Sequence, residues 1–84
     1  MSIPKEKFSF TEKQGQYLAF IYNYSKINGQ APAQRDIQQF FNVTPPTIHQ
    51  MILHLEKKNF IRRVPNTPRS LSINIPIDLI PKLK

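Results

Sequence analysis

Two helical patterns lie next to each other in this chain, with almost no residues between them. The first spans residues 33–41 and the second spans residues 44–58, so only Asn42 and Val43 separate them. A connection this short permits only a tight helix-turn-helix corner. The rest of the fold has to be built around that corner.

Each of the two helices has apolar residues that predict its buried side. In residues 44–58 they recur at offsets of zero, three, four and seven, which at about 3.6 residues per turn makes one stripe: Ile48, Met51, Ile52 and Leu55. In residues 33–41 the side chains expected in the core are Ile37, Phe40 and Phe41, while Arg35 and Asp36 stay outside. Both helices therefore need a common core to pack against.

The second helix begins with an unusual sequence, Thr44-Pro45-Pro46. Thr44 is a suitable N-cap, and its hydroxyl is expected to accept a hydrogen bond from the N–H of Thr47. Proline costs little in the first turn, where an N–H has no acceptor within the helix. The prolines remove two donors that could have bound phosphate, so we expect side chains to make the contacts at this helix tip.

The side of this helix opposite the apolar stripe predicts contact with bases. It holds Pro46, Gln50, Leu53 and Lys57, flanked by Thr47, His49 and His54. Threonine, histidine and glutamine in the first turns are groups that read base edges in the major groove. The predicted base-reading residues are Thr44, Pro46, Thr47, His49 and Gln50. Taken alone, the pattern fits an ordinary amphipathic surface helix equally well.

An earlier helix is predicted from Thr11 to about Asn28. Thr11 and Gln14 have the spacing of a capping box, and Gly29 should end the helix. It has two apolar faces, one with Leu18, Ile21, Tyr22 and Ser25, the other with Tyr17, Phe20, Tyr24 and Ile27. One face should meet the core, and the second should meet either the core or a second copy of the chain.

After the helices the period changes to that of β-structure. Residues 61–64 and 71–75 are rich in β-branched side chains, with a turn at residues 65–69 between them. The helix over residues 44–58, the key helix of the predicted fold, should stop at Asn59, which tolerates a left-handed cap. The predicted fold is mainly α with a small antiparallel β-hairpin, a winged helix-turn-helix spanning residues 11–75. Residues 1–10, with Phe8 and Phe10, form an arm, and residues 76–84 form a tail.

The charge of the chain predicts an anionic partner. Twelve Lys and Arg against five Asp and Glu give a net charge of +7. The predicted contacts to a DNA backbone form an acid-free run after the key helix: Lys57, Lys58, Arg62, Arg63 and Arg69. Eighty-four residues make only a small core, which a homodimer would supplement. The spare face of the first helix and the apolar tail are the candidate dimer surfaces.

Enzyme and metal functions find no support in the sequence. His49 and His54 are five residues apart and cannot share a metal as an i, i+4 pair can. There is no cysteine and no Gly-rich phosphate loop, so we expect no metal, cofactor or small-molecule ligand. No apolar run reaches membrane-spanning length and no secretory signal is present, so we expect a cytoplasmic location. The competing functions are a winged-helix protein-interaction module and, third, binding of RNA or single-stranded nucleic acid.

From Phe10 to about Ile73 the sequence resembles the N-terminal DNA-binding domain of LexA repressors. The matching positions are Thr11, Gln14, Gly29, Pro32, Asp36-Ile37, Thr44-Pro45, His49, Leu55-Glu56-Lys57-Lys58, Ile61-Arg62-Arg63 and Arg69. The resemblance implies sequence-specific binding of duplex DNA by a transcriptional regulator, most simply a repressor. It also implies base contacts by Thr44, Thr47, His49 and Gln50, and a backbone contact by Arg69 at the wing tip.

The chain departs from this family at several positions. Pro46 stands where a small polar residue is usual, Asn59 replaces a glycine that ends the helix, and Ser70 replaces a glycine or alanine. The DNA site of a standard member therefore need not be the site of this chain. The sequence also ends where the family continues into a self-cleaving peptidase domain with a serine–lysine dyad, so damage-triggered self-cleavage is not expected of it.

Overall fold

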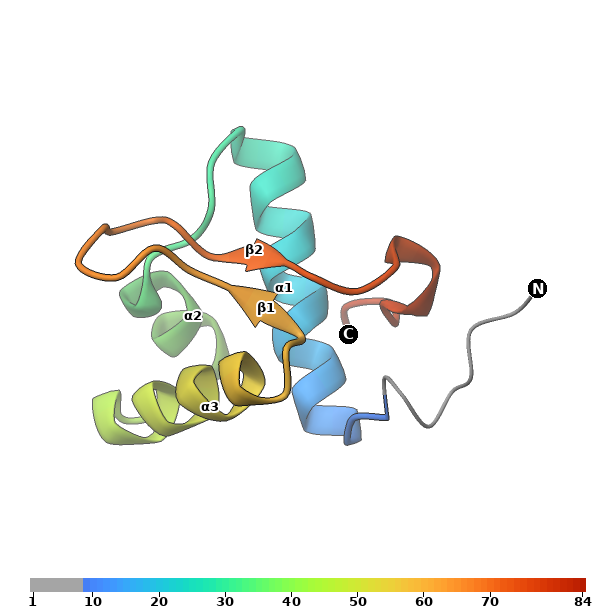
Figure 1. The fold of residues 1–84 in the computed structure, drawn as a ribbon. Helices are drawn as coiled ribbons and strands as arrows, with labels where there is room; N and C mark the ends of the chain where they lie inside the picture. The colour runs from blue at the N-terminus through green and yellow to red at the C-terminus, as the bar shows by residue number, and fades with distance from the viewer. Residues whose placement is uncertain (1–8) are drawn as a thin grey trace.

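The helix-turn-helix forms one side of the structure (Figure 1). The computed structural model describes residues 9–84, so Phe8 and most of the predicted arm lie outside the described residues. The elements in order are α1 (Glu12–Asn28), α2 (Gln34–Phe41), α3 (Pro45–Lys57), β1 (Ile61–Arg62), β2 (Ser72–Ile73) and the short 3-10 helix η2 (Ile77–Leu79). Figure 1 shows α2 and α3 on one side of α1, with the hairpin folded back along α3. This mainly helical fold with one antiparallel hairpin confirms the predicted class.

The ends of α1 are those predicted from the sequence. The Thr11 hydroxyl accepts from the Gln14 N–H at 3.1 Å, and the Gln14 side chain accepts from the Thr11 N–H at 2.9 Å. Gly29 has a left-handed φ of 72°, and its N–H donates to the Ser25 carbonyl at 2.9 Å. Two sequence-coded caps therefore fix the length of the helix.

Both apolar faces of α1 are used inside the molecule. Tyr17 lies 4.2 Å from Phe41 between ring centroids, and Phe20 lies 4.6 Å from Phe40. Tyr17 is fully buried and Phe20 is 8 % exposed, so this part of the face is not free for a second copy of the chain, whereas Ile27 at its end is 80 % exposed. The prediction that Phe40 would be buried is wrong, because it covers Phe20 from outside and stays 48 % exposed.

α3 packs on the core through the predicted stripe. Ile48, Ile52 and Leu55 are buried and Met51 is half-buried. The helix ends as expected before Asn59, which has a φ of 63°. One detail of its start differs from the prediction: the Thr44 hydroxyl makes no hydrogen bond to a backbone N–H and instead lies 2.8 Å from the Thr47 hydroxyl.

The hairpin is shorter than predicted. It has two paired positions, Ile61 with Ile73 and Arg62 with Ser72, instead of strands over residues 61–64 and 71–75. Beyond them the Ser70 hydroxyl replaces the ladder: it accepts from the Val64 N–H at 2.9 Å and donates to the Val64 carbonyl at 3.2 Å. A side chain, rather than a third residue pair, thus closes the base of the wing loop, which comprises residues 64–69.

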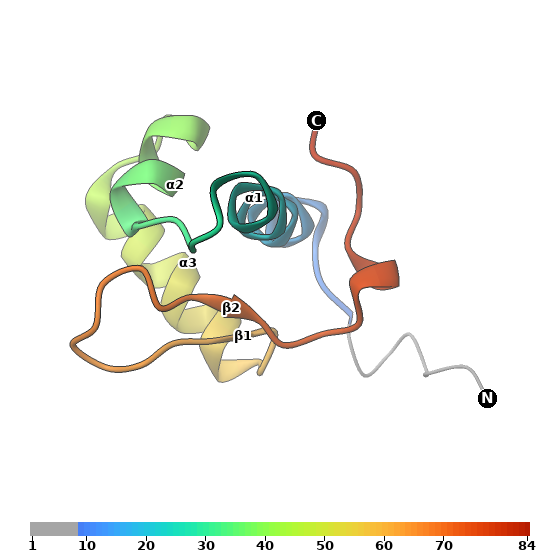
Figure 2. The ribbon, with the colours of Figure 1, turned by 90° about the horizontal axis from the view of Figure 1, so that it is seen from above.

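The tail packs on its own chain. The Gln16 side chain donates to the Lys82 carbonyl at 3.0 Å and accepts from the Lys84 N–H at 2.8 Å. Gly15 allows this close approach, since a Cβ there would lie 3.0 Å from the Pro81 ring and 2.9 Å from Phe10. Figure 2 shows the tail on the side of α1 away from α2 and α3. The half-buried apolar residues of the tail, Leu79, Ile80 and Leu83, are therefore not the free dimer surface that the sequence suggested.

Candidate nucleic-acid interface

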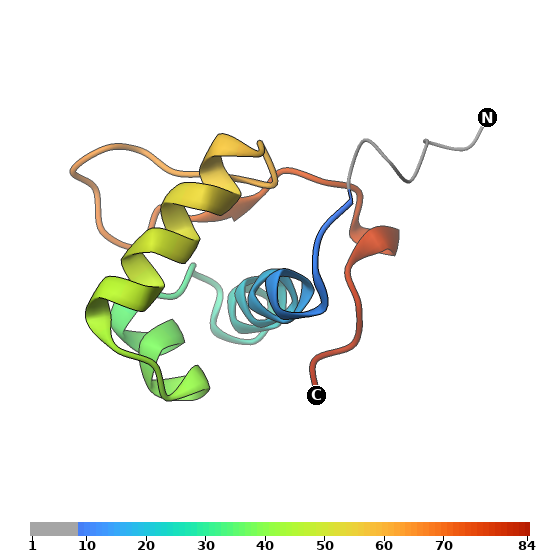
Figure 3. The same cartoon turned by 90° about the horizontal axis from the view of Figure 1, so that it is seen from below.

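The outer face of α3 is open along its whole length. Figure 3 looks onto this helix, and no other part of the ribbon lies in front of it. Every residue predicted to read bases is exposed, together with the rest of that face: Thr44, Pro46, Thr47, His49, Gln50, Leu53, His54 and Lys57. The structure thus brings the predicted base-reading residues together on one accessible side, directly opposite the buried stripe.

The tip of α3 presents side chains rather than backbone donors. Ile48 makes the first bond of the helix, from its N–H to the Thr44 carbonyl at 3.1 Å. Of the three positions before it, which have no acceptor within any helix, Pro45 and Pro46 carry no N–H, so only Thr47 offers a backbone donor at the tip. The hydroxyl pair of Thr44 and Thr47 lies at the same end. Each hydroxyl can donate and accept, so the pair can adapt to either kind of base edge.

A shallow hollow runs along one flank of this face. It has a volume of about 510 Å³ and is lined by Pro46, Thr47, Gln50, Met51 and His54. Thr44 and His49 do not line it, so three of the five predicted base-reading residues border the hollow and two lie outside it. The lining combines apolar surface with amide, hydroxyl and imidazole groups, which suits the mixed methyl and hydrogen-bonding surface of a major-groove edge.

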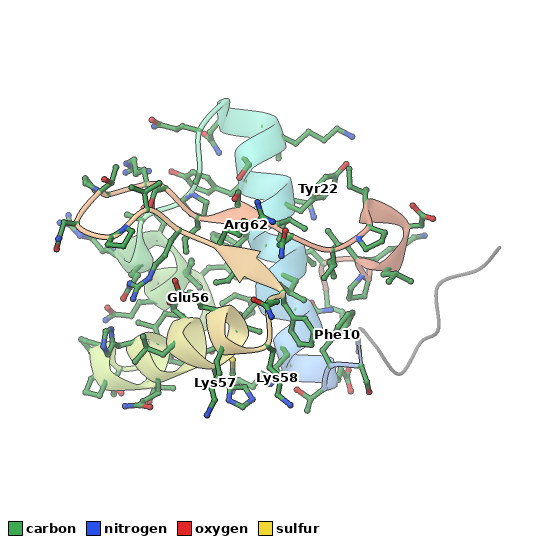
Figure 4. All side chains as sticks on the ribbon, in the orientation of Figure 1. Phe10, Tyr22, Glu56, Lys57, Lys58 and Arg62 are labelled. Carbon is green, nitrogen blue, oxygen red and sulfur yellow. The ribbon has the colours of Figure 1, made fainter. Side chains whose placement is uncertain are left out.

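The predicted backbone contacts do not all behave alike. Lys57, Lys58 and Arg62 are exposed. Figure 4 shows Lys57 and Lys58 extending from the end of α3 away from the hairpin, and Arg62 on the outer face of the hairpin. These three side chains offer positive charge on two sides of the α3 terminus, where a phosphate backbone alongside the helix would pass.

Arg63 is held by an ion pair inside the molecule. Its Nε lies 3.1 Å from Oε1 of Glu56, and the two side chains are 29 % and 35 % exposed. Glu56, from the last turns of α3, thus neutralises part of the positive charge that the sequence predicted after this helix. A phosphate contact by Arg63 requires this pair to open.

Arg69 is also engaged, and it does not project from the wing. Its Nη1 lies 3.1 Å from Oδ2 of Asp36, 3.3 Å from the Tyr24 hydroxyl and 3.4 Å from the Ala31 carbonyl. The hydrogen bond to Tyr24, together with the Asp36 charge, raises the pKa of the Arg69 guanidinium above its usual range. Asp36, predicted to lie outside, is in fact half-buried beneath this contact.

Sequence reasoning missed the partners of these two arginines. Glu56 and Arg63 are seven residues apart, across the end of a helix and a left-handed Asn59, where no helical spacing applies. Asp36 and Arg69 are separated by 33 residues. The one available signal was the position of Asp36 three residues after Ala33, where it accepts the Ala33 N–H at 2.8 Å and so has a fixed orientation.

Other kinds of site receive no support from the described part of the chain. Within residues 9–84, no three His, Cys, Asp or Glu side chains gather where they could hold a metal ion. Over the same residues, no helix combines the length and the apolar character needed to cross a bilayer.

Comparison with known proteins identifies the family of this arrangement. Residues 8–70 match the model of the LexA DNA binding domain. The LexA repressor of Thermosipho melanesiensis is 46 % identical over 63 residues, which are 75 % of this chain and 32 % of that protein. Those of Thermotoga maritima and Finegoldia magna are 38 % and 41 % identical over 64 residues, or 76 % and 75 % of this chain and 32 % and 31 % of theirs. The chain thus spans about a third of the length of these relatives. Its match to the family model, together with the fold, shows that it belongs to the LexA DNA-binding domain family.

Proposed function

We propose that this chain is a sequence-specific, duplex DNA-binding repressor of transcription that inserts α3 into the major groove. The observation that carries the proposal is the exposed face of α3, where all five predicted base-reading residues lie opposite a buried stripe. Family membership supports it, and the relatives are themselves named as LexA repressors. Repressors of this kind act on the chromosome, so we place the protein in the prokaryotic cytoplasm, on the nucleoid.

In this proposal the contacts divide by role. Thr44, Pro46, Thr47, His49 and Gln50 read bases, while Lys57, Lys58 and Arg62 meet the backbone at the end of α3 and on the hairpin. Arg63 joins the backbone contacts only if DNA displaces Glu56 from its ion pair. A phosphate contact by Arg69 would likewise need its ion pair with Asp36 to open.

We further propose that two copies bind one site. A single winged domain touches few base pairs, and pairing doubles the footprint on sites whose halves lie about one helical turn apart. The surfaces first considered for pairing are largely used within the chain. The apolar residues still open beside the tail are Ile27 and Ile77, which are 80 % and 58 % exposed and border one hollow with Tyr22 and Leu83.

A binding assay with three kinds of nucleic acid tests the proposal. The intact chain should enrich one sequence from a pool of random duplexes, and it should bind that duplex more tightly than the matching single strand or RNA. Tighter binding to the single strand or to RNA would favour the third function, and equal affinity for all three would reject sequence-specific duplex binding. No binding to any of them would favour a protein-interaction module.

Gln50→Ala tests whether α3 reads bases. Glutamine can bond adenine through two hydrogen bonds, so its loss should weaken the enriched site by about 1–3 kcal/mol and leave random duplex nearly unaffected. Gln39→Ala is the matched control, since Gln39 is an exposed glutamine of α2. Equal losses on enriched and random duplex would remove Gln50 from the base-reading set.

A further inference from the structure

The wing loop has few contacts of its own. Its ladder consists of two residue pairs, and every residue from Val64 to Arg69 is exposed. The Ser70 hydroxyl closes the base of the loop, and a turn from Val64 to Thr67 shapes its tip through an N–H to carbonyl bond of 3.2 Å. Hairpins this short are marginal in isolation, so something else must fix the direction in which the loop points.

Arg69 supplies that connection to three other parts of the fold. Its guanidinium reaches Tyr24 in α1, the Ala31 carbonyl in the connection between α1 and α2, and Asp36 in α2. The same Asp36 oxygen accepts the Ala33 N–H at the start of α2. Because α2 packs against α3, this network ties the wing loop to the helix-turn-helix itself.

The backbone at Arg69 is consistent with a residue held in place from outside. Its φ of 56° is left-handed, which is unfavourable for a residue with a Cβ. Arginine has no local side-chain bond that favours this conformation, unlike the asparagines at the other non-glycine positions of positive φ: Asn42, Asn59 and Asn66. Such strain persists where surrounding contacts determine the conformation.

We propose that Arg69 is a positioning residue, which locks the wing loop to α2 through Asp36 and Tyr24 so that the wing and α3 meet DNA together, and that it makes no phosphate contact. The inference rests on the proposed DNA-binding function. A positioning role and a phosphate contact by Arg69 predict opposite effects of Asp36 on DNA binding. Under the positioning role Asp36 supports DNA binding, whereas under a phosphate role Asp36 competes with DNA for the arginine.

The decisive experiment is a cycle of Asp36→Asn, Arg69→Ala and the double variant, measured on enriched and random duplex at several salt concentrations. We expect each single variant to weaken the enriched site by about 3- to 10-fold and the double variant to be no weaker than Arg69→Ala, because both changes open the same contact. The salt dependence should stay that of the unaltered protein. Tighter binding by Asp36→Asn, or a salt slope reduced by about one in Arg69→Ala, would overturn the proposal in favour of a phosphate contact.

Matched variants separate positioning from charge and from folding. Asp78→Asn removes one acidic charge at an exposed position that, among the described residues, forms no ion pair, so it corrects for the general gain in DNA affinity that follows loss of a negative charge. Tyr24→Phe removes only the hydroxyl that Arg69 contacts and keeps the ring against Phe20. Thermal melts then show which variants are folded.

A readout on the free protein completes the test. Amide hydrogen exchange in residues 63–71 should speed up in Arg69→Ala, Asp36→Asn and, more weakly, Tyr24→Phe, while the amides of α3 keep their protection. Unchanged wing exchange in all three would overturn the positioning role. This readout needs no DNA, so failure of the proposed function, seen as absence of specific binding by the unaltered chain, is distinguishable from failure of the inference.

Discussion

Single side chains in this domain often serve two neighbours at once. The Asp36 carboxylate accepts the Ala33 N–H and pairs with Arg69, and the Ser70 hydroxyl satisfies both backbone groups of Val64. A substitution at either position therefore loses more than one interaction and leaves a backbone group without a partner. Their effects should be larger than those of an ordinary surface change.

For Tyr17 we expect the opposite effect, since loss of its hydroxyl should not destabilise the domain. Its ring is fully buried against Phe41, and among the described residues its hydroxyl has no hydrogen-bond partner. Burial also raises the pKa of this hydroxyl. Because an unpaired buried hydroxyl is destabilising by about 1–3 kcal/mol, Tyr17→Phe should keep or raise the free energy of unfolding measured in urea. A loss of stability would mean that the hydroxyl has a bonded partner, such as a buried water.

At the scale of the element, α3 depends on its central buried side chain. Ile52 is fully buried between Ile48 and Leu55, so Ile52→Ala should lower the free energy of unfolding by about 2–5 kcal/mol, a large share of the stability of so small a domain. Denaturant melts measure the change.

Ile27→Ala, in α1, is the control for Ile52→Ala, because the same substitution at a position 80 % exposed should change stability little. Equal effects at the two positions would contradict the orientation of α3 and place its stripe away from the core.

The helices were predictable from sequence because their signals are local. The Thr11–Gln14 capping box, the left-handed Gly29 and Asn59, and the stripe through Ile52 all act within one or two turns. The exposed face of α3 opposite the buried stripe follows from the same periodicity. The class of fold could therefore be predicted from the sequence alone.

The remaining features could not be read from local pattern. The strands stop early because Ser70 takes over the bonds of Val64, and periodicity does not register a side chain that replaces a backbone pair. The partners of Arg63 and Arg69 come from distant parts of the chain, and the tail turns back onto Gln16. Charge counted along a sequence therefore overstated the number of cations available to DNA.

For the whole molecule, the number of predicted backbone-contacting cations outside the two ion pairs predicts the salt dependence of DNA binding. Five phosphate contacts per copy would give a dimer a log–log slope of roughly −9, whereas Lys57, Lys58 and Arg62 alone give roughly −5. We expect the smaller value, since Arg63 and Arg69 are held in ion pairs. Titrations of the enriched duplex between low and physiological salt measure it, and a slope near −9 would show that both ion pairs open on DNA.

Stoichiometry at the same scale tests the pairing of two copies. Light scattering on the complex should give two protomers per enriched duplex. Ile77→Lys should lower this number toward one if the hollow between Ile27 and Ile77 is the contact. Lys13→Ala, at an exposed position of α1, serves as a surface control. One protomer per site at saturation would reject the dimer.

The folded-back tail determines how this domain can be handled as a tool. Lys84 bonds to Gln16 and forms an ion pair with Glu12, so the carboxyl end emerges beside the first half of α1, behind the helix-turn-helix (Figure 1, Figure 2). A fluorescent reporter or a biosensor tether joined after Lys84 would start on the far side of α1 from α3 and leave the exposed face of α3 unobstructed. A fusion that omits residues just before Lys84 would lose the bonds to Gln16 and uncover Gly15 and Phe10, so the reporter should be joined after Lys84.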